Sequence, residues 1–327
     1  MTIDWQRFAE VIQSHERFLL TSHIRPDCDA LGSELGMAGL LEALGKQVMI
    51  LNGQRTPPNL AFLDPGRRIQ VVGEDVKKDE LSNIDLLMVL DTSAWVQLGA
   101  MAEVVRDTEA KKVIVDHHVS EDDLGAESFK DTVAEATGRL VADAAEQLGV
   151  ALTPQMAESL YAAIATDTGW FRFASTNSGT YRTAAKLVDA GASPDNIFRQ
   201  LYEQETAARV RLRGVILARA QTELAGRLAH TYVLQQDFQQ TGALPSDTED
   251  VINMVLAIQG VEFALILVEQ KAGGFKLSFR SRCNVEASAM AEQFDGGGHK
   301  AAAGATISGS FEDAQPRVLD AVREAMR

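Results

Sequence analysis

Residues Lys112–His118 are Lys-Val-Ile-Val-Asp-His-His. The run Val113–Val115 predicts a short buried strand, because β-branched residues favour strands and helix formers are few here. This strand ends at an acid and two imidazoles, groups that are costly to bury unless they are paired or bind a metal. We therefore interpret Asp116, His117 and His118 as one wall of a candidate metal site.

Two other apolar segments end in the same way. Phe18–Ser22 ends at His23, and Leu86–Leu90 ends at Asp91. If these strands are parallel, their carboxyl ends share one edge of the sheet, which is where ligands bind in open α/β folds. A single Asp at a strand end is more often a helix N-cap than a ligand. Three strands with the same feature favour a site.

Three further acids extend the candidate ligand set. Asp27 and Asp29 lie two residues apart on a loop that Pro26 stiffens, and Asp167 ends an apolar helix, where it opposes the helix dipole and requires a compensating cation. Carboxylates and imidazoles without thiolates suit manganese or magnesium better than structural zinc. Two divalent ions would balance the charge of these three acids and Asp91. A bound phosphate would then need cations from elsewhere in the chain.

The composition is that of an acidic globular protein. The chain has 327 residues, a formal net charge of −15 and 46% hydrophobic residues, and this length favours two domains. The acidic balance argues against a general grip on long nucleic acid, which needs a broad basic surface. Two cysteines are too few for a disulfide framework, and no apolar run has signal-peptide or membrane-spanning character. We therefore expect a cytoplasmic protein with no membrane association.

Strand and helix alternate in the first part of the chain. This pattern predicts an α/β fold with a doubly wound, mostly parallel sheet and helices on both of its faces. We expect this metal-binding catalytic domain over residues 1–193 and a helical linker over residues 194–222. A smaller α+β domain with a mixed sheet is expected over residues 223–327.

The expected C-terminal domain contains a candidate anion site. Gly296–Gly298, followed by His299 and Lys300, predicts a glycine-rich turn whose backbone N–H groups can approach a phosphate. The start of a following helix would add its dipole. Arg280 and Arg282 on an extended segment would supply the positive charge that the metal core lacks, because guanidinium groups suit bidentate phosphate contacts.

Taken together, these segments resemble the DHH phosphoesterase superfamily with the DHH-associated C-terminal domain. The matching segments follow the family's order and span almost the whole chain: His23–Ser33, Val89–Thr92, Val115–His118, Thr166–Gly169 and Gly296–Gly304. The length and two-domain plan are similar to the bacterial branch of oligoribonucleases (nanoRNases) and 3′-phosphoadenosine 5′-phosphate phosphatases. Cys28 departs from the pattern, since the family commonly has glycine between the two acids.

The resemblance implies two manganese ions, with magnesium as a substitute. One ion would lie near His23, Asp27 and Asp91, and the other near Asp29, Asp91, His117 and Asp167, so that Asp91 bridges them. Asp116 would orient an imidazole, and His118 would face the substrate phosphate or the leaving oxygen as a catalytic residue. The C-terminal domain would bind the far end of the substrate through Arg280, Arg282, Gly297, Gly298 and His299.

The resemblance also implies a reaction. A hydroxide activated by two metals would hydrolyse a phosphoester at the end of a very short oligonucleotide or of 3′-phosphoadenosine 5′-phosphate. This is the activity of a manganese-dependent oligoribonuclease, an exonuclease on very short chains, and of a 3′(2′),5′-bisphosphate nucleotidase. The expected partners are short RNA or DNA oligonucleotides or a nucleoside bisphosphate as substrate. Assembly into a homodimer is left open.

Several alternatives share parts of this pattern. A cyclic-dinucleotide phosphodiesterase of the cyclic di-AMP type uses the same residues, and the sequence does not separate it from the first choice. A processive single-strand exonuclease is disfavoured because no additional nucleic-acid-binding domain is found. A soluble pyrophosphatase would carry a Lys/Arg cluster in place of the glycine-rich turn. A non-catalytic nucleotide sensor or RNA-binding protein is disfavoured by the complete set of acids.

Overall fold

The structure, a computed structural model, describes residues 3–81 and 83–327. The chain forms two compact units, Met1–Gln204 and Glu205–Arg327. The range 194–222, expected as a helical linker, contains α8 (Pro194–Tyr202) in the first unit and α9 (Ala207–Ala218) in the second. Within the described ranges, no helix combines the length and the apolar character needed to cross a membrane.

The first unit is built on a six-stranded sheet in the order β3-β2-β1-β4-β5-β6. All five strand pairs are parallel, so the predicted doubly wound sheet is confirmed. The strands are β1 (Arg17–Thr21), β2 (Gln47–Asn52), β3 (Ile69–Val71), β4 (Leu86–Leu90), β5 (Lys111–Asp116) and β6 (Glu127–Lys130). The strand order reverses between β1 and β4, which makes their carboxyl ends the switch point of the fold.

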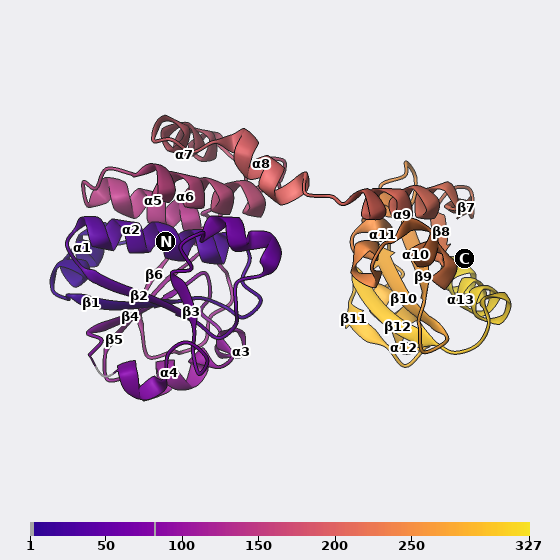
Figure 1. Cartoon of the computed structure of the whole chain (residues 1–327), viewed down its shortest axis with the longest axis horizontal. Coiled ribbons are helices and arrows are strands. Elements are labelled where there is room, and N and C mark those ends of the chain that lie inside the picture. Colours follow the sequence, from indigo (N-terminus) through magenta and orange to yellow (C-terminus); the bar gives the residue numbers. More distant parts are fainter. Residues whose placement is uncertain (1–2, 82) are drawn as a thin grey trace. The chain divides into compact units, whose positions relative to one another are not determined.

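Helices cover both faces of this sheet, as expected (Figure 1). One face carries α1 (Trp5–Gln13), α2 (Cys28–Ala43) and α5 (Thr137–Gln147), with α6 (Pro154–Asp167), α7 (Ser178–Asp189) and α8 farther from the strands. The other face carries α3 (Trp95–Leu98) and α4 (Met101–Asp107), and the 3-10 turns η1 (Pro58–Leu63) and η2 (Lys78–Leu81) lie in connections. Adjacent strand residues such as Leu19 and Leu20 enter different cores, as the period of two requires.

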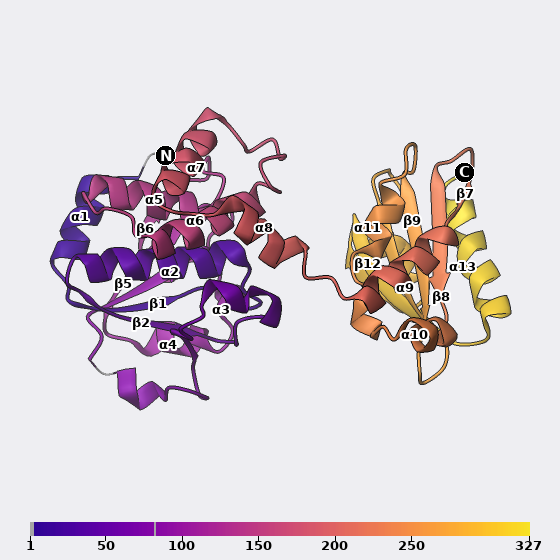
Figure 2. The ribbon, with the colours of Figure 1, turned by 45° about the horizontal axis from the view of Figure 1, so that its top comes forward.

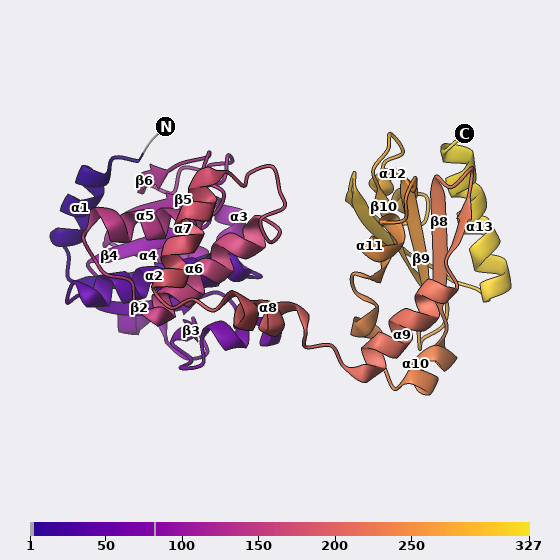
Figure 3. The same ribbon diagram turned by 90° about the horizontal axis from the view of Figure 1, so that it is seen from above.

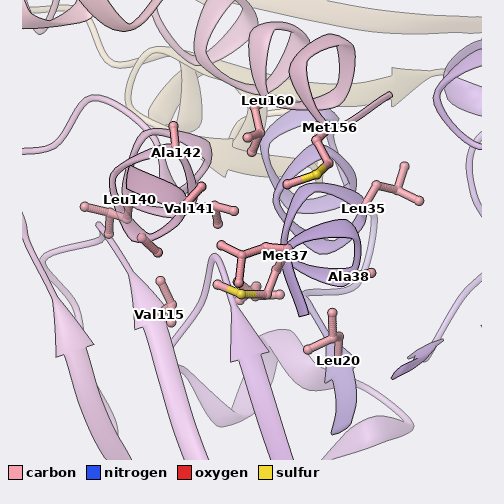
Figure 4. Close-up of a cluster of buried hydrophobic side chains, with 14 of the residues drawn as sticks. Leu20, Leu35, Met37, Ala38, Val115, Leu140, Val141, Ala142, Met156 and Leu160 are labelled. Carbon is pink, nitrogen blue, oxygen red and sulfur yellow. The ribbon is translucent and has the colours of Figure 1, made fainter. Parts of the chain in front are cut away.

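Helices α2 and α6 pack against each other through glycines of α2. A Cβ atom on Gly36 would lie 2.5 Å from Leu160, and one on Gly39 would lie 2.5 Å from Met156. A Cβ on Gly32 would collide with the backbone carbonyl oxygen of Ser159. Figure 4 shows Leu160 and Met156 directed from α6 toward α2. Successive glycines along α2 meet earlier residues of α6, so the helices are antiparallel, and the start of α2 lies beside the end of α6.

The second unit is a mixed six-stranded sheet in the order β11-β12-β10-β9-β8-β7. Only β8 and β9 pair in parallel, and the other four pairs are antiparallel. The strands are β7 (Gln221–Glu223), β8 (Leu228–Val233), β9 (Phe263–Glu269), β10 (Phe275–Ser281), β11 (Gly297–His299) and β12 (Ala302–Ile307). The predicted mixed sheet is confirmed.

Two separate cores lie on the two faces of the second sheet. One contains residues of α9 and of α11 (Val251–Leu256), beside α10 (Gln235–Thr241) and the turn η3 (Pro245–Thr248). The other contains residues of α12 (Ala287–Glu292) and α13 (Phe311–Ala325). Figure 3 shows α11 and α13 on opposite sides of the strands.

The glycine-rich segment differs from its prediction. We expected a turn at Gly296–Gly298 and a helix start after it, but Gly297–His299 is the edge strand β11, and the strand β12 follows. Gly298 has a φ of 147°, and a Cβ there would lie 2.6 Å from the Ala303 Cα. Residues 301–305 are alanine and glycine, which allows the two strands to pair closely. Because a strand follows in place of the expected helix, no helix start adds its dipole to this segment.

Gly32→Ala is expected to destabilise the first unit. The new methyl group meets the carbonyl of Ser159, which is backbone and cannot rotate away, so the helices must separate at a cost of about 1–3 kcal/mol. Gly214→Ala in α9 is the matched control, because its Cβ meets nothing within 4 Å. It should stabilise by about 0.5–1 kcal/mol. Thermal and urea unfolding measure both, and equal stability of Gly32→Ala and the parent would contradict the packing argument.

Glu127 in β6 is expected to support stability only above acidic pH. Its carboxylate lies 2.7 Å from Arg7 Nε and 2.6 Å from Lys111 Nζ, and hydrogen bonds from these two groups lower its pKa to about 2. The stabilisation is present above the unfolded pKa of about 4.3 and is lost as the pH falls through the folded pKa. Because the ion pair is partly exposed, its contribution is about 1 kcal/mol or less.

Urea unfolding of Glu127→Gln and the parent at several pH values checks this prediction. The parent should be more stable at pH 7, and the gap should close between about pH 4.3 and pH 2. A gap that stays constant over this range would show that the charge of Glu127 is not the cause.

Candidate metal centre

The carboxyl ends of β1, β4 and β5 deliver the first group of candidate residues. His23 follows β1, Asp91 follows β4 directly, and His117 follows β5. Because β1 and β4 are neighbours at the switch point, His23 and Asp91 meet there, with 3.4 Å between His23 Nε2 and Asp91 Oδ2. Asp91 has a φ of 61° and is 2% exposed. This backbone conformation is uncommon outside glycine, although Asp adopts it more readily than most residues.

Helices α2 and α6 deliver the remaining acids. Asp27 is the N-cap of α2 and accepts hydrogen bonds from the backbone of Asp29 and Ala30. Asp29 lies in the first turn of α2, and Asp167 is the last residue of α6. The antiparallel packing of these helices places both acids at the same edge as the strand ends.

The acids and imidazoles form two groups that share Asp91. In the first group, His23 Nε2 lies 3.8 Å from Asp27 Oδ1 and 3.4 Å from Asp91 Oδ2. His117 Nε2 lies 3.6 Å from Asp91 Oδ1, 3.7 Å from Asp29 Oδ2 and 3.6 Å from Asp167 Oδ2. The structure therefore brings together all six expected metal ligands, and each oxygen of Asp91 faces a different histidine.

The tautomers of both histidines leave Nε2 as the coordinating atom. His23 Nδ1 lies 2.9 Å from the carbonyl oxygen of Ile24, and His117 Nδ1 lies 3.2 Å from that of Ala134. A carbonyl only accepts, so each Nδ1 carries a hydrogen, and Nε2 is the ring atom that faces the acids and can coordinate a metal. The Nε2–oxygen separations of 3.4–3.8 Å exceed a hydrogen bond. Two coordination bonds of about 2.0–2.2 Å would span them, so these residues fit a divalent ion.

The electrostatics of the acids also favour a bound cation. Burial, reinforced by neighbouring carboxylates, holds the pKa of Asp29 and of Asp91 well above the usual range. Burial likewise raises the pKa of Asp167. Among the residues that the structure describes, the ion pairs formed by these three acids involve histidines only. A divalent ion would remove the unfavourable charge that raises the three pKa values.

The start of α5 holds two of the acids, and this contact was not predicted. The backbone N–H groups of Thr137 and Gly138 donate to Asp29 at 2.7 and 2.8 Å. The Thr137 hydroxyl donates to Asp91 Oδ1 at 2.9 Å. The N-cap position of α5 is Ala136, which cannot cap the helix itself. In the sequence, the one sign of this contact is that the start of α5 lacks a residue able to cap the helix, so that an acid from another element can do so.

A second network orients His118, as the resemblance implied for Asp116. Asp116 is fully buried: its Oδ1 accepts a hydrogen bond from His118 Nδ1 at 2.8 Å, its Oδ2 accepts one from the Ser93 hydroxyl at 2.8 Å, and Lys130 Nζ forms an ion pair with Oδ2 at 3.2 Å. Burial alone would raise the pKa of Asp116, but the hydrogen bonds from His118 and Ser93 lower it to about 2. The same hydrogen bond raises the pKa of His118. Ser93 and Lys130 were not predicted.

Two further features lie behind the metal-facing residues. Glu34 accepts a hydrogen bond from Asn52, and Asn52 accepts one from the backbone of Ser22, so a buried network fixes the chain just before His23. Burial raises the pKa of Glu34 to about 7. Cys28, the departure from the family pattern, is buried, and burial raises its pKa to about 12. Because the thiolate is the reactive form, Cys28 is a packing residue here.

In the second unit, Arg280 and His299 share one face of the sheet. Arg280 in β10 and His299 in β11 both pair with Ala302 of the intervening β12, so their side chains lie on the same face, about 10 Å apart. Gly297 is exposed on this edge. Gly298 has a positive φ and packs closely on Ala303, so the backbone alone accounts for a glycine at this position.

Arg282 has different neighbours. It follows β10, its Nη1 lies 3.5 Å from the carbonyl oxygen of Leu256, and it lines a cavity of about 530 Å³ with Arg227 and Arg327. Arg280, Gly297 and His299 thus lie on neighbouring strands of one sheet, and no hydrogen bond or ion pair among the described residues joins Arg282 to them.

Comparisons with known proteins agree with this geometry. The model of the DHH family, N-terminal domain, matches residues 17–164, and that of the DHHA1 domain matches residues 226–327. Over 98% of its length the chain is 31% identical to the bifunctional oligoribonuclease and PAP phosphatase NrnA of Thermus thermophilus, of which 95% is covered.

Two solved structures share the fold. An exopolyphosphatase-related protein from Bacteroides fragilis matches with a TM-score of 0.80 at 24% identity, covering 98% of this chain and 95% of that one. Exonuclease RecJ bound to manganese matches with a TM-score of 0.54 at 14% identity, covering 100% and 96%. The site geometry, the two family matches and the full-length similarity to NrnA lead to one conclusion: the chain belongs to the DHH family of phosphoesterases and carries a DHHA1 domain after its DHH domain.

Proposed function

We propose that this phosphoesterase hydrolyses the terminal phosphoester of very short oligonucleotides and of 3′-phosphoadenosine 5′-phosphate, with two divalent ions as cofactors. The observation that carries the proposal is the position of Asp91, whose two oxygens face the Nε2 atoms of His23 and His117. One buried carboxylate placed between two imidazole–carboxylate groups is the arrangement that a two-metal site needs.

Each group would hold one ion. His23, Asp27 and Asp91 form the first, and Asp29, Asp91, His117 and Asp167 form the second. When bound, two such ions lower the pKa of a water molecule and stabilise the charge that develops at phosphorus. Manganese is the proposed metal, with magnesium as a substitute, because the donors are carboxylates and imidazoles. The manganese bound to RecJ supports this choice.

The chain's own residues would position the substrate and move a proton. Asp116 accepts a hydrogen bond from His118 Nδ1, and this bond raises the pKa of His118. The ring would therefore stay protonated to higher pH and offer its Nε2–H to a phosphate oxygen or to the leaving oxygen. His118 is half exposed and lies beside Asp91, with 3.8 Å between Nδ1 and Oδ1. Lys130 and Ser93 hold the other oxygen of Asp116, so the imidazole has one orientation.

We further propose that residues 1–193 catalyse the reaction and residues 223–327 bind the far end of the substrate. Arg280 and His299 offer a guanidinium and an imidazole on one face of the sheet for a second phosphate. The net charge of −15 disfavours an extended basic surface that could bind a long nucleic acid. Short substrates fit this distribution of charge, and the oligoribonuclease and PAP phosphatase activities for which NrnA is named support the same substrate class.

Product release with manganese present tests the proposed substrates. We expect phosphate from 3′-phosphoadenosine 5′-phosphate and mononucleotides from RNAs of two to five nucleotides, with slower turnover of cyclic di-AMP and of pyrophosphate. Preferred turnover of cyclic di-AMP would make the chain a cyclic-dinucleotide phosphodiesterase instead. Without turnover of any of these substrates, the enzymatic proposal would fail.

Asp91→Asn is expected to lower kcat by more than about 100-fold, because a residue that merely supports a ligand already contributes 10- to 100-fold. The variant should also lose the rise in melting temperature that manganese gives the parent. Asp189→Asn at the exposed end of α7 is the control and should match the parent in both measurements. Undiminished turnover by Asp91→Asn would falsify the shared-ligand assignment.

Arg280→Ala is expected to raise KM for 3′-phosphoadenosine 5′-phosphate by about 10- to 100-fold with kcat nearly unchanged. This range corresponds to the loss of a hydrogen bond to a charged group. Lys276→Ala is the control, since Lys276 lies on the same face of β10 but four residues, or about 13 Å, away. Equal effects of the two substitutions would indicate a general charge effect and contradict a specific contact at Arg280.

A further inference from the structure

The chain directly after Asp167 has an unusual backbone. Gly169, Trp170 and Phe171 have φ values of 56°, 60° and 62°, so three consecutive residues are left-handed. Two of them are aromatic, and bulky side chains rarely adopt this conformation. Such costly backbone persists only where surrounding contacts hold it, and it concentrates at functional sites. The segment connects α6 with α7 and projects from the helical layers in Figure 2.

Trp170 and Phe171 anchor this segment to the first unit. Their rings pack edge-on or tilted against Tyr161 of α6, with centroids 6.2 and 5.8 Å away. Trp170 also contacts Phe198 and Tyr202 of α8, at 5.0 and 5.7 Å. These contacts hold the left-handed residues in place.

Phe173 is 55% exposed. Its ring lies across Gly169, because a Cβ atom on that glycine would be 2.5 Å from Phe173 Cε1. The backbone N–H of Phe173 donates to the carbonyl oxygen of Thr168 at 3.0 Å. The Arg172 Nε donates to the carbonyl oxygen of Gly169 at 2.6 Å. One side of the ring is therefore supported by backbone, and the rest is open to solvent.

Gly169, which supports this ring, is close to the candidate metal centre. Gly169 follows Asp167 by two residues, so their Cα atoms are at most about 7.6 Å apart. Asp167 Oδ2 is 3.6 Å from His117 Nε2, within the second candidate metal group. A flat apolar surface held on the residues that follow a candidate metal ligand, with the Arg172 guanidinium beside it in the chain, has the features of a base-stacking surface.

We infer that Phe173 stacks against the nucleobase of the nucleotide whose phosphate lies at the metal centre, and that Arg172 provides positive charge beside that base. This inference rests on the proposed function and adds a base-binding site within the first unit. An aromatic ring contacts the face of a base and not its hydrogen-bonding edge, so purines and pyrimidines should both bind there.

Kinetics of position-173 variants test the site with a diadenylate and with a matching dinucleotide that lacks the base of the nucleotide at the metal centre. For diadenylate, Phe173→Ala should raise KM by about 5- to 150-fold, the range for loss of one base–aromatic stack, with kcat nearly unchanged. Phe173→Leu should behave like Phe173→Ala, because it keeps apolar volume but removes the aromatic face. Phe173→Tyr should retain the parental KM, which shows that the position tolerates substitution. On the dinucleotide without that base, all variants should match the parent.

Three outcomes would overturn the stacking site. A parental KM for Phe173→Leu would indicate a general apolar contact. An equal rise in KM on both dinucleotides would indicate a structural effect on the metal centre. The same base-dependent rise in Tyr181→Ala, an exposed aromatic on α7 that stacks on Phe171 at 5.5 Å, would show that Phe173 is not the specific contact. Failure of the parent to hydrolyse either dinucleotide would instead refute the proposed function.

Discussion

The buried negative charge of Asp29 and Asp91 is the constraint on which the rest of the first unit depends. Both carboxylates are nearly inaccessible to water, at 1% and 2% exposure, and burial, reinforced by neighbouring carboxylates, raises the pKa of each. Backbone N–H groups at the start of α5 and the Thr137 hydroxyl compensate part of this charge. A further positive charge beside the acids, where the Nε2 atoms of His23 and His117 lie, would compensate the remainder. A pair of divalent ions would do so, and catalysis would use the same ions.

The packing of α2 against α6 determines where two of the buried acids lie. Gly32, Gly36 and Gly39 allow α2 to approach α6 closely, and the antiparallel arrangement brings the start of one helix beside the end of the other. The same close packing places Asp29 near Asp167, because each acid lies at the adjoining helix end. Stability of the helix pair and assembly of the metal centre are therefore coupled. Structural glycines in α2 are part of the site even though they contact no ligand.

In the proposed function, the segment after Asp167 and the second unit would serve substrate recognition. In the first unit, aromatic side chains hold a left-handed turn that leaves Phe173 exposed a few residues after the candidate ligand Asp167. In the second unit, strand register places Arg280 and His299 on one sheet face. Substrate length would then be selected by contacts to the base and phosphates of a few nucleotides, because the acidic surface offers little to a longer chain.

The sequence by itself determined the strands and the residues at their ends. Alternating strand and helix patterns and apolar runs ending at His23, Asp91 and Asp116 are local signals, and parallel pairing brings such ends to one edge. Tertiary structure alone decided that Asp29 caps α5, that Lys130 supports Asp116, and that Gly297–His299 is an edge strand rather than a turn. The short, weakly apolar β6 also escaped prediction. These features depend on partners far away in the sequence, and local propensity carries no information about which distant backbone group will satisfy a hydrogen bond.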